Sequence, residues 1–481
     1  MEEIYLRLFD IIWAILIINS IISVTVIVLE RKKPEKTIAW LLVFVIMPPV
    51  GLFFYIFLGR NWKKHKLNEN TNLHINELMY ESLKQIRNPE YYPIIKLISR
   101  NSESPLFMDN SIEIFKDGVE KFAALKQELK KAQHHIHLEY YIVKSDEIGN
   151  EIKDILIRKA NEGVQVRFII DRVGSIKIKK SYIKELQDNG VEVVQYSYFL
   201  APFLRDINTQ INYRNHRKIV IIDGKVGFLG GINIGDEYLG RGKLGYWRDT
   251  HMMVKGDFVL GLQAVFLDDF ANIKKANKED FSYNNQFDKF FPETGNYDGK
   301  RMQIIQSGPD SEFPSIMQAE LKMISMAKKN IFITTPYFVP SDCIINALKI
   351  SKLGGARVCI LFPEQYDHFL VHYASRTYLK DLASCGVEIY LYDAKSFLHA
   401  KSMSIDGELC TIGTANMDIR SHELNYEING IVYDEETTKK LDSLFYEDIK
   451  NSTLINEEYF NKQPVWIKYL EAICRIFSSL L

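Results

Sequence analysis

The feature that most constrains the fold of this chain is a short motif, H-x-K-x4-D, that occurs twice. Its two copies are His216, Lys218 and Asp223, and His399, Lys401 and Asp406. Each copy is followed by a glycine-rich turn and then by an asparagine, Asn233 or Asn416. One copy could arise by chance, but two copies with the same downstream spacing predict a duplicated fold with a site built around two histidines.

The spacing within each motif predicts which side chains face the site. Residues 218–222 and 401–405 are short and rich in apolar residues, so each stretch is expected to form a strand. Side chains alternate along a strand, so a histidine and the lysine two residues later share one face. A lysine ammonium neutralises phosphoryl oxygens and a neutral imidazole nitrogen can attack phosphorus, so the pattern suits a bound phosphate.

The aspartate of each motif is followed by a glycine, Gly224 or Gly407. Asp-Gly favours a tight hairpin turn at the end of a strand. Asp223 and Asp406 therefore have two interpretations, as members of the site or as turn formers.

The duplication extends beyond the motifs. Residues 190–193 recur 196 positions later, and the helix-forming stretch before them, residues 182–186, recurs at the same offset. Each half alternates strands with helices, which is typical of an α/β sheet covered by helices. The two histidines are only 183 positions apart, so the first half carries about 13 extra residues, near 199–214. This insertion is either a substrate loop or a plain surface loop.

Composition excludes some classes of protein. The 481 residues allow two or three domains, and a hydrophobic content of 47% suits a globular protein slightly enriched by membrane segments. The formal net charge of −1 argues against a general nucleic-acid binder, which carries a basic excess. The five cysteines form no C-x-x-C pair and no cluster with metal-ligand spacing stands out, so we expect no metal site.

Two apolar stretches at the N-terminus predict a membrane anchor. Residues 11–29 are long enough to span a bilayer, and residues 37–58 form a second apolar run without charge. Basic clusters flank the second run on both ends, and Pro48 and Pro49 break it. Since positive charge marks the cytoplasmic side, we expect a re-entrant second segment with the large domain in the cytoplasm. Two full spans are the alternative.

The segments beside the large domain are also predicted to be helical. Residues 68–92 are polar and are expected to form a linker helix. At the C-terminus, six apolar residues recur at helical spacing and outline an amphipathic helix. They are Trp466, Tyr469, Leu470, Ile473, Phe477 and Leu480. This helix either contacts the membrane interface or packs on the large domain.

With two complete motifs in a duplicated α/β chain, the sequence resembles the phospholipase D superfamily. The N-terminal apolar segments, the length, and the stretches 247–251 and 424–429 make it similar to the bacterial cardiolipin synthases. The resemblance implies an α/β fold of two pseudo-symmetric α/β/α sandwich halves, preceded by a transmembrane or re-entrant helical hairpin. The expected domains are the hairpin at 1–66, the linker at 67–100, the two halves at 101–295 and 296–460, and the C-terminal amphipathic helix at 461–481.

The resemblance also implies how the site works. Both histidines meet at one phosphate, where His216 attacks phosphorus to form a phosphohistidine and His399 protonates the leaving alcohol and then activates the incoming one. The reverse assignment of the two histidines is the alternative. The residues implied in holding the phosphate or orienting the histidines are Lys218, Lys401, Asn233, Asn416, Asp249, Glu427, Gly230 and Thr414. Gly231 departs from the superfamily pattern, in which this position is often serine.

The implied substrates are lipids. Two phosphatidylglycerol molecules would give cardiolipin and glycerol at a bacterial inner (plasma) membrane, with no cofactor, no metal and no nucleic-acid partner. The alternatives are a membrane phospholipase D, a phosphatidyltransferase that uses another alcohol, a nuclease of the same superfamily and a non-catalytic lipid-binding scaffold. The sequence gives no oligomeric state and no lipid range beyond phosphatidylglycerol.

Overall fold

The computed structural model describes residues 91–196, 213–277, 287–293 and 295–476, and a few positions between 21 and 43. The chain divides into two compact units, residues 1–63 with 198–213, and residues 64–197 with 214–481. The second unit contains both motifs, and the fold below is that of its described residues.

Several expected segments lie outside the described residues. They are most of the two N-terminal apolar runs, most of the linker 67–100, most of the insertion 199–214, and Phe477 and Leu480 of the C-terminal helix. In the part of the chain that the structure describes, no helix combines the length and apolar character needed to cross a bilayer. The membrane hairpin therefore stays a prediction.

The second unit is built around two large mixed β-sheets, one from each half of the repeat. The strands of the first sheet are β1 (Asn110–Asp117), β2 (His135–Tyr140), β3 (Gln165–Asp171), β4 (Glu192–Tyr196), β5 (Lys218–Ile222), β6 (Val226–Gly230) and β7 (Tyr246–Gly256). Those of the second are β8 (Arg301–Ser307), β9 (Asn330–Thr334), β11 (Arg357–Pro363), β12 (Glu388–Tyr392), β14 (Ser402–Ile405), β15 (Leu409–Gly413), β17 (Glu427–Tyr433) and β18 (Ser452–Ile455).

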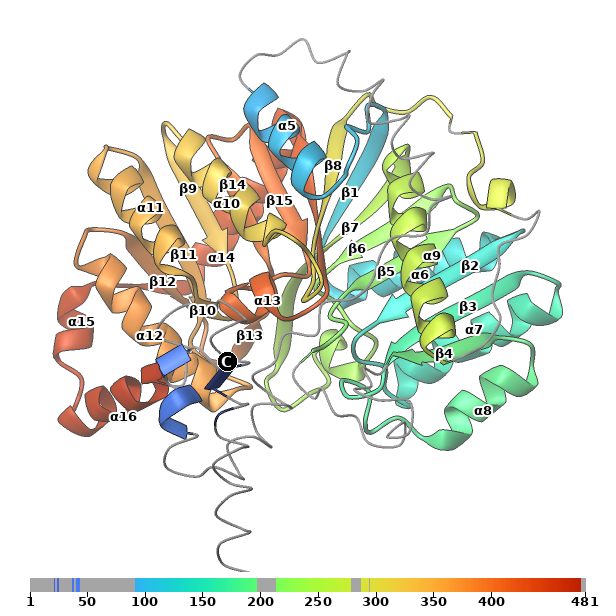
Figure 1. The fold of residues 1–481 in the computed structure, drawn as a ribbon, viewed down its shortest axis with the longest axis horizontal. Helices are drawn as coiled ribbons and strands as arrows, with labels where there is room; N and C mark the ends of the chain where they lie inside the picture. Colours follow the sequence, from blue (N-terminus) through green and yellow to red (C-terminus); the bar gives the residue numbers. More distant parts are fainter. Residues whose placement is uncertain are drawn as a thin grey trace, which may run out of the picture. The chain divides into compact units, whose positions relative to one another are not determined.

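The two sheets have the same strand order (Figure 1). The first runs β1-β7-β6-β5-β2-β3-β4 and the second runs β8-β17-β15-β14-β9-β11-β12, with β18 added at its edge. In each sheet three neighbouring strands are parallel, and the remaining strands pair antiparallel. Because order and direction match strand for strand, the two halves are copies of one folding unit, and the predicted duplication is confirmed.

Helices cover both faces of each sheet. The outer faces carry α6 (Gly118–Lys131), α7 (Glu147–Asn161) and α8 (Lys180–Asp188) in the first half, and α10 (Ser315–Met326), α11 (Asp342–Leu353) and α12 (Phe369–Ala383) in the second. The inner faces carry α9 (Phe258–Ala276) and α14 (Glu435–Lys450). The shorter elements are α5 (Tyr92–Asn101), η3 (Asp236–Leu239), η4 (Phe287–Phe290), β10 (Phe338–Val339), β16 (Met417–Asp418), α13 (Ile419–Glu423), α15 (Glu457–Asn461) and α16 (Val465–Ile476).

Alternation along the strands produces these layers. Phe168 of β3 is buried under the outer helices, whereas the next residue, Ile169, is buried in the cluster around α9. That inner cluster also contains Cys410 and Ile412 of β15, so apolar packing joins the two halves. The observed layers are those of two α/β/α halves packed on each other.

The two halves also exchange short backbone segments. Strand β13 (Ser396–Leu398) belongs to the second half but pairs in parallel with the start of β7 in the first sheet. In the opposite direction, Asn215 of the first half forms a parallel bridge with Tyr426 of the second. Each exchanged segment leads directly into a motif histidine, so the exchange positions both histidines at the boundary between the halves.

The expected hairpin turns follow β5 and β14. Asp223 and Gly224 have φ of 55° and 65°, and Asp406 and Gly407 have φ of 55° and 71°, which is the backbone of a two-residue hairpin turn with two left-handed positions. Each aspartate also accepts three backbone N–H bonds. The donors are the N–H groups of Gln133, His134 and His135 for Asp223, and of Lys328, Lys329 and Asn330 for Asp406.

We expect Asp223→Ala to lower the stability of the fold without lowering the activity of the folded fraction. Its carboxylate binds three backbone N–H groups at the start of β2 and ties them to the turn, so its loss costs roughly 1–3 kcal/mol. Thermal unfolding of the full chain, with cardiolipin formation normalised to folded protein, measures both quantities. Asp223→Asn keeps the turn preference and is the matched control. A loss of chemistry at unchanged stability would contradict this role.

Candidate active site

The two motif histidines are fixed by the backbone of the opposite half. The N–H of His216, just before β5, donates to the carbonyl oxygen of Tyr426 at 2.9 Å. The N–H of His399, just after β13, donates to the carbonyl oxygen of Arg248 at 2.7 Å. The imidazole of each histidine is largely buried. A pseudo-twofold relation between the halves therefore extends into the site.

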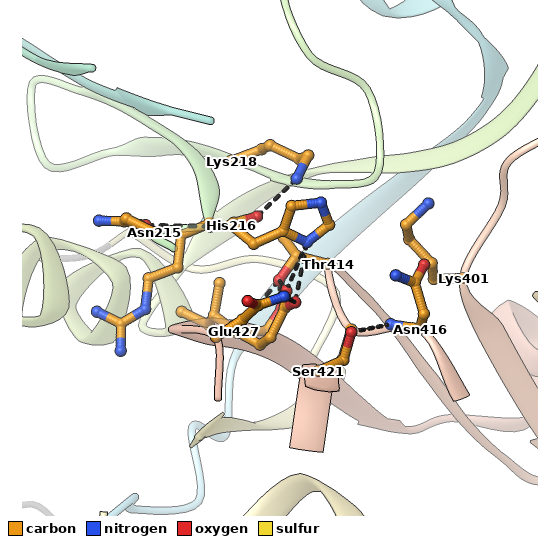
Figure 2. Close-up of polar contacts among 12 residues, drawn as sticks. Asn215, His216, Lys218, Lys401, Thr414, Asn416, Ser421 and Glu427 are labelled. Carbon is orange, nitrogen blue, oxygen red and sulfur yellow. Dashed lines mark hydrogen bonds and ion pairs between the residues drawn. The ribbon is translucent and has the colours of Figure 1, made fainter. Parts of the chain in front are cut away.

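Each imidazole is also paired with a carboxylate of the opposite half. Nδ1 of His216 lies 2.9 Å from the carboxylate of Glu427 on β17 (Figure 2). Nδ1 of His399 lies 2.7 Å from Oδ2 of Asp249 on β7. Strands β7 and β17 are equivalent in the two sheets, so the two pairs are related by the same pseudo-symmetry. The sequence predicted that these carboxylates orient the histidines, but not that the pairs cross between the halves.

The pair of His216 and Glu427 holds its proton on the imidazole. Burial by itself raises the pKa of the Glu427 carboxyl, but His216, Lys218 and Thr414 together bring this pKa below its ordinary value. Burial lowers the pKa of His216 to about 4, although Glu427 opposes this shift. An ionised carboxylate can only accept, so the neutral imidazole donates from Nδ1 and keeps a lone pair on Nε2.

The pair of His399 and Asp249 has the same charge states. Burial by itself raises the pKa of the Asp249 carboxyl, but Lys401, His399 and the Thr250 N–H lower it overall. Burial and the neighbouring Lys401 lower the pKa of His399 below its ordinary value. Both imidazoles are therefore neutral near neutral pH.

Two buried lysines accompany the histidines. Lys218 is 0% exposed and Lys401 is 2% exposed. Nζ of Lys218 donates to the carbonyl oxygen of His216 at 2.6 Å, and Nζ of Lys401 donates to that of His399. Figure 2 shows their amino groups on two sides of the His216 ring. This places two ammonium groups beside the atoms that would do the chemistry.

The pKa values of both lysines are lowered. Burial lowers the pKa of Lys218 to about 7, an effect that Lys401 reinforces and Glu427 opposes. Burial lowers the pKa of Lys401 to about 8, against the attraction of Asp249 and Glu427. A bound anion would stabilise both ammonium groups, because its negative charge compensates for the water that burial removes from around them. The arrangement is that of a binding site for a phosphate group.

Comparison with known proteins agrees with this geometry. Residues 125–243 and 321–449 match a family model described as cardiolipin synthase, phospholipase D-like domain, and residues 11–60 match one described as phospholipase D-nuclease N-terminal. A cardiolipin synthase of Geobacillus sp. (strain WCH70) is 44% identical over 97% of this chain and 93% of its own length. One of Geobacillus kaustophilus (strain HTA426) is 41% identical over 98% and 94%.

The chain belongs to the cardiolipin synthase family. The resemblance read from the two motifs is thereby confirmed, and the chain is an enzyme of the phospholipase D type. The crystal structure of the phosphatidylserine synthase of Haemophilus influenzae Rd KW20 has the same fold, with a TM-score of 0.60 over 82% of this chain and 98% of that one. At 14% identity this likeness concerns the fold alone.

The structure does not place the aspartates of the two motifs beside the histidines. Asp223 and Asp406 follow the ends of β5 and β14, where their carboxylates bind the backbone N–H groups described above. Of the two interpretations that the sequence allowed, the geometry favours the turn. The physical reason is the strand itself, which carries the aspartate five residues away from the motif lysine.

The two downstream asparagines differ in their surroundings. Asn233 accepts from the Ile142 N–H at 3.1 Å and donates to the Tyr238 hydroxyl at 2.5 Å, so its amide orders the surrounding loops. The side-chain oxygen of Asn416 is buried and has no hydrogen-bond partner among the described residues. Figure 2 shows Asn416 beside Lys401. The side-chain oxygen of Asn416 can therefore accept a hydrogen bond from a ligand. The amide of Asn233 already forms its hydrogen bonds within the protein.

The positions after the motif glycines also differ between the halves. The hydroxyl of Thr414 donates to Oε2 of Glu427 at 2.6 Å and so helps to hold that carboxylate. At Gly231, a Cβ would lie 2.0 Å from Oδ1 of Asp249. The absent side chain makes room for the carboxylate. Gly230 is crowded in the same way, with a Cβ position 2.5 Å from Cα of His251.

Sequence reasoning missed several residues that line the histidines. The amide of Asn425 donates to Oε1 of Glu427 at 3.1 Å, and the ring of Tyr141 lies 4.9 Å from that of His216. Tyr141 could have been found, because it follows β2, the strand that neighbours β5. Asp367 is close enough to His399 and Lys401 to oppose the lowering of their pKa by burial, and it accepts from the Tyr337 hydroxyl at 2.6 Å. Its position in a loop before α12 gives no signal in the sequence.

Potential metal ligands were the second feature of the site that the sequence addressed. Among the described residues, no three His, Cys, Asp or Glu side chains gather as a metal site would require. Metal-independent chemistry stays a prediction from the sequence.

The affinity of the site for an inorganic anion should fall as the pH rises through about 7 and 8. Lys218 and Lys401 are charged below these pKa values and neutral above them. Each lost ammonium should weaken binding by at least about tenfold. Inhibition by tungstate, whose charge is constant in this range, measures the effect. Lys218→Met should remove part of the pH dependence and the surface variant Lys126→Met should not, whereas a flat profile in the wild type would contradict the assignment.

Proposed function

We propose that this member of the cardiolipin synthase family makes cardiolipin and glycerol from two phosphatidylglycerol molecules through a covalent phosphohistidine. Membership of the family supports the overall reaction. The observation that supports the covalent route is the pair of neutral histidines, each held by a carboxylate of the opposite half, beside two buried lysines. Two imidazoles at one phosphate can serve as nucleophile and as acid and base.

In the first step, Nε2 of His216 attacks the phosphorus of the donor lipid. A P–N bond forms, and the P–O bond to the terminal glycerol breaks. The Nε2 proton of His399 passes to the leaving oxygen. Glycerol departs and the phosphatidyl group stays on His216.

In the second step, the hydroxyl of another phosphatidylglycerol gives its proton to Nε2 of His399. The hydroxyl oxygen attacks phosphorus and the P–N bond breaks. Cardiolipin leaves, and both histidines return to their starting protonation states. The same residue serves as acid and then as base, as microscopic reversibility requires.

The proton on His399 is expected to arrive when the substrate binds. Before the substrate binds, this imidazole is neutral, because burial and Lys401 lower its pKa. A phosphodiester anion placed against it favours the charged form and raises the pKa again. The negative charge of the substrate therefore favours the protonated form of His399 that the first step requires.

The remaining site residues support the two histidines. Lys218 and Lys401 would stabilise the phosphoryl oxygens as charge develops, and the amide of Asn416 would add a hydrogen bond. Asp249 and Glu427 would fix the tautomer, as the acidic member of a hydrolase triad does. We propose for Asn233, Gly230 and Thr414 the indirect task of shaping the loops and the carboxylates around the histidines.

We also infer that residues 11–58 hold the enzyme at the bacterial plasma membrane, with the large domain on the cytoplasmic side. The two apolar runs, the flanking basic clusters and the N-terminal family match at 11–60 support this. A tethered site raises the effective concentration of lipid hydroxyls, which favours transfer over hydrolysis by water. We keep the domain limits 1–66, 67–100, 101–295, 296–460 and 461–481 as part of this proposal.

Purified full-length protein in mixed micelles of phosphatidylglycerol, without added metal, should form cardiolipin and free glycerol in equal amounts. His399→Ala should abolish both products while the protein stays folded, because each step needs this group. Chromatography of the lipids and an enzymatic glycerol assay give the two yields. Phosphatidic acid with glycerol but no cardiolipin would identify a hydrolase instead, and turnover in both histidine variants would dismiss the two-histidine mechanism.

A donor with an acidic leaving group, such as a phosphatidyl nitrophenol, should trap the intermediate in His399→Ala. Its leaving group needs no proton, whereas the second step lacks its base, so the phosphatidyl group should accumulate on His216. Mass spectrometry of the peptide that contains His216 detects the adduct. The matched control is His216→Ala, which should carry none. An adduct on His399 in that control would reverse the assignment of the two histidines.

A further inference from the structure

The C-terminal helix α16 leaves most of its apolar face uncovered. The helix lies against α12 (Figure 1). It packs there through Cys474 and through a buried ion pair between Glu471 and Arg376, whose Oε1 and Nε lie 2.6 Å apart. Trp466 and Tyr469 are 65% and 70% exposed. The other exposed apolar residues of this helix are Val465, Ile473 and Ile476. Packing on the large domain, one of the two expectations from the sequence, therefore uses only the narrow side of the helix.

A second exposed apolar cluster lies at the start of α12. Tyr366, Phe369 and Leu370 are each more than two-fifths exposed. The rings of Tyr366 and Phe369 are 5.9 Å apart, and both contact the ring of Tyr373, at 6.0 and 4.7 Å. Tyr373 and Leu470 of α16 pack against the same core. The cluster and α16 are thus joined through α12.

This cluster borders the active site. Asp367, next to Tyr366, accepts from the Tyr337 hydroxyl and acts electrostatically on His399 and Lys401. A surface that contacts the cluster is therefore also held close to the catalytic histidine.

The charges of α16 favour an anionic partner. Its acidic residue, Glu471, is buried against Arg376. The remaining charged residues of the helix, Lys468 and Arg475, are basic, although Arg475 also pairs with Asp381 of α12 at 3.0 Å. Tyrosine and tryptophan beside basic residues are typical of helices that lie in the interface of a bilayer. The substrate of the proposed reaction is itself an anionic lipid of that interface.

We infer that the exposed face of α16 and the aromatic cluster of residues 366–373 dock together on the surface of a phospholipid bilayer. This contact holds the mouth of the site at the lipid headgroups, in addition to the N-terminal anchor. The inference rests on the proposed function, since it assigns to the same site the surface from which its lipid substrates enter.

The depth of Trp466 tests the docking directly. The full chain and Trp466→Phe are reconstituted into vesicles of phosphatidylglycerol and phosphatidylcholine whose acyl chains are brominated near the headgroup. The difference between their emission spectra is the signal of Trp466. We expect bromine to quench this difference signal. An unquenched signal would overturn the inference.

A kinetic test uses a variant that leaves the catalytic groups untouched. In mixed micelles, Trp466→Ser combined with Tyr469→Ser should raise the KM for the mole fraction of phosphatidylglycerol by about tenfold and leave kcat unchanged. The matched control is Ile350→Ser with Leu353→Ser, which removes residues of α11 that are 69% and 76% exposed. This control should behave like the wild type.

The outcomes separate the inference from the proposed function. Failure of the wild type to make cardiolipin would dismiss the function, whereas normal synthesis with an unchanged KM in the α16 variant would dismiss the docking surface alone. If the variant instead changed a dimer into a monomer in light scattering, without quenching by brominated lipid, a second copy of the chain would cover this face and the inference would be wrong.

Discussion

The site depends on the crossing of its two histidine–carboxylate pairs between the halves of the repeat. His216 is held by Glu427 and His399 by Asp249, and the backbone N–H of each histidine also binds the opposite half. Neither half alone contains a histidine with its orienting carboxylate. Correct packing of the two sheets is therefore the condition for a competent site, and the apolar cluster that joins α9 with β15 supplies the energy for that packing.

The same crossing sets the electrostatics of the site. Burial removes water from two carboxylates and two lysines at once. The neighbouring histidines and lysines keep the carboxylates ionised against this effect, whereas burial brings the pKa of Lys218 and Lys401 to about 7 and 8. The charged form of each lysine therefore lacks part of the stabilisation that water would give it. A phosphodiester supplies what is missing, so binding energy and protonation of the catalytic groups are coupled in a single event.

Local patterns predicted the strands, the hairpin turns and the duplicated α/β order, because alternation and Asp-Gly turn chemistry act within a few residues. They also marked His216, Lys218, His399 and Lys401, since spacing two residues apart on a strand fixes a common face. The same reasoning left two interpretations of Asp223, because the backbone N–H groups that its carboxylate binds are about 90 residues away in the sequence. The resemblance implied Thr414, whereas Asn425 was missed, since the bonds of both residues to Glu427 depend on how loops of one half meet.

By itself, the sequence determined which chemistry the chain can perform: two H-x-K motifs in two copies of one fold require paired imidazoles and ammonium groups for a phosphate. The tertiary structure decided which carboxylate serves which histidine, where the motif aspartates go, and which face of α16 stays exposed. The physical reason is the separation along the chain over which each effect acts. Side-chain periodicity and turn preference are local, whereas pairing partners, burial and the resulting pKa shifts arise only when residues distant in the chain exclude water from one another.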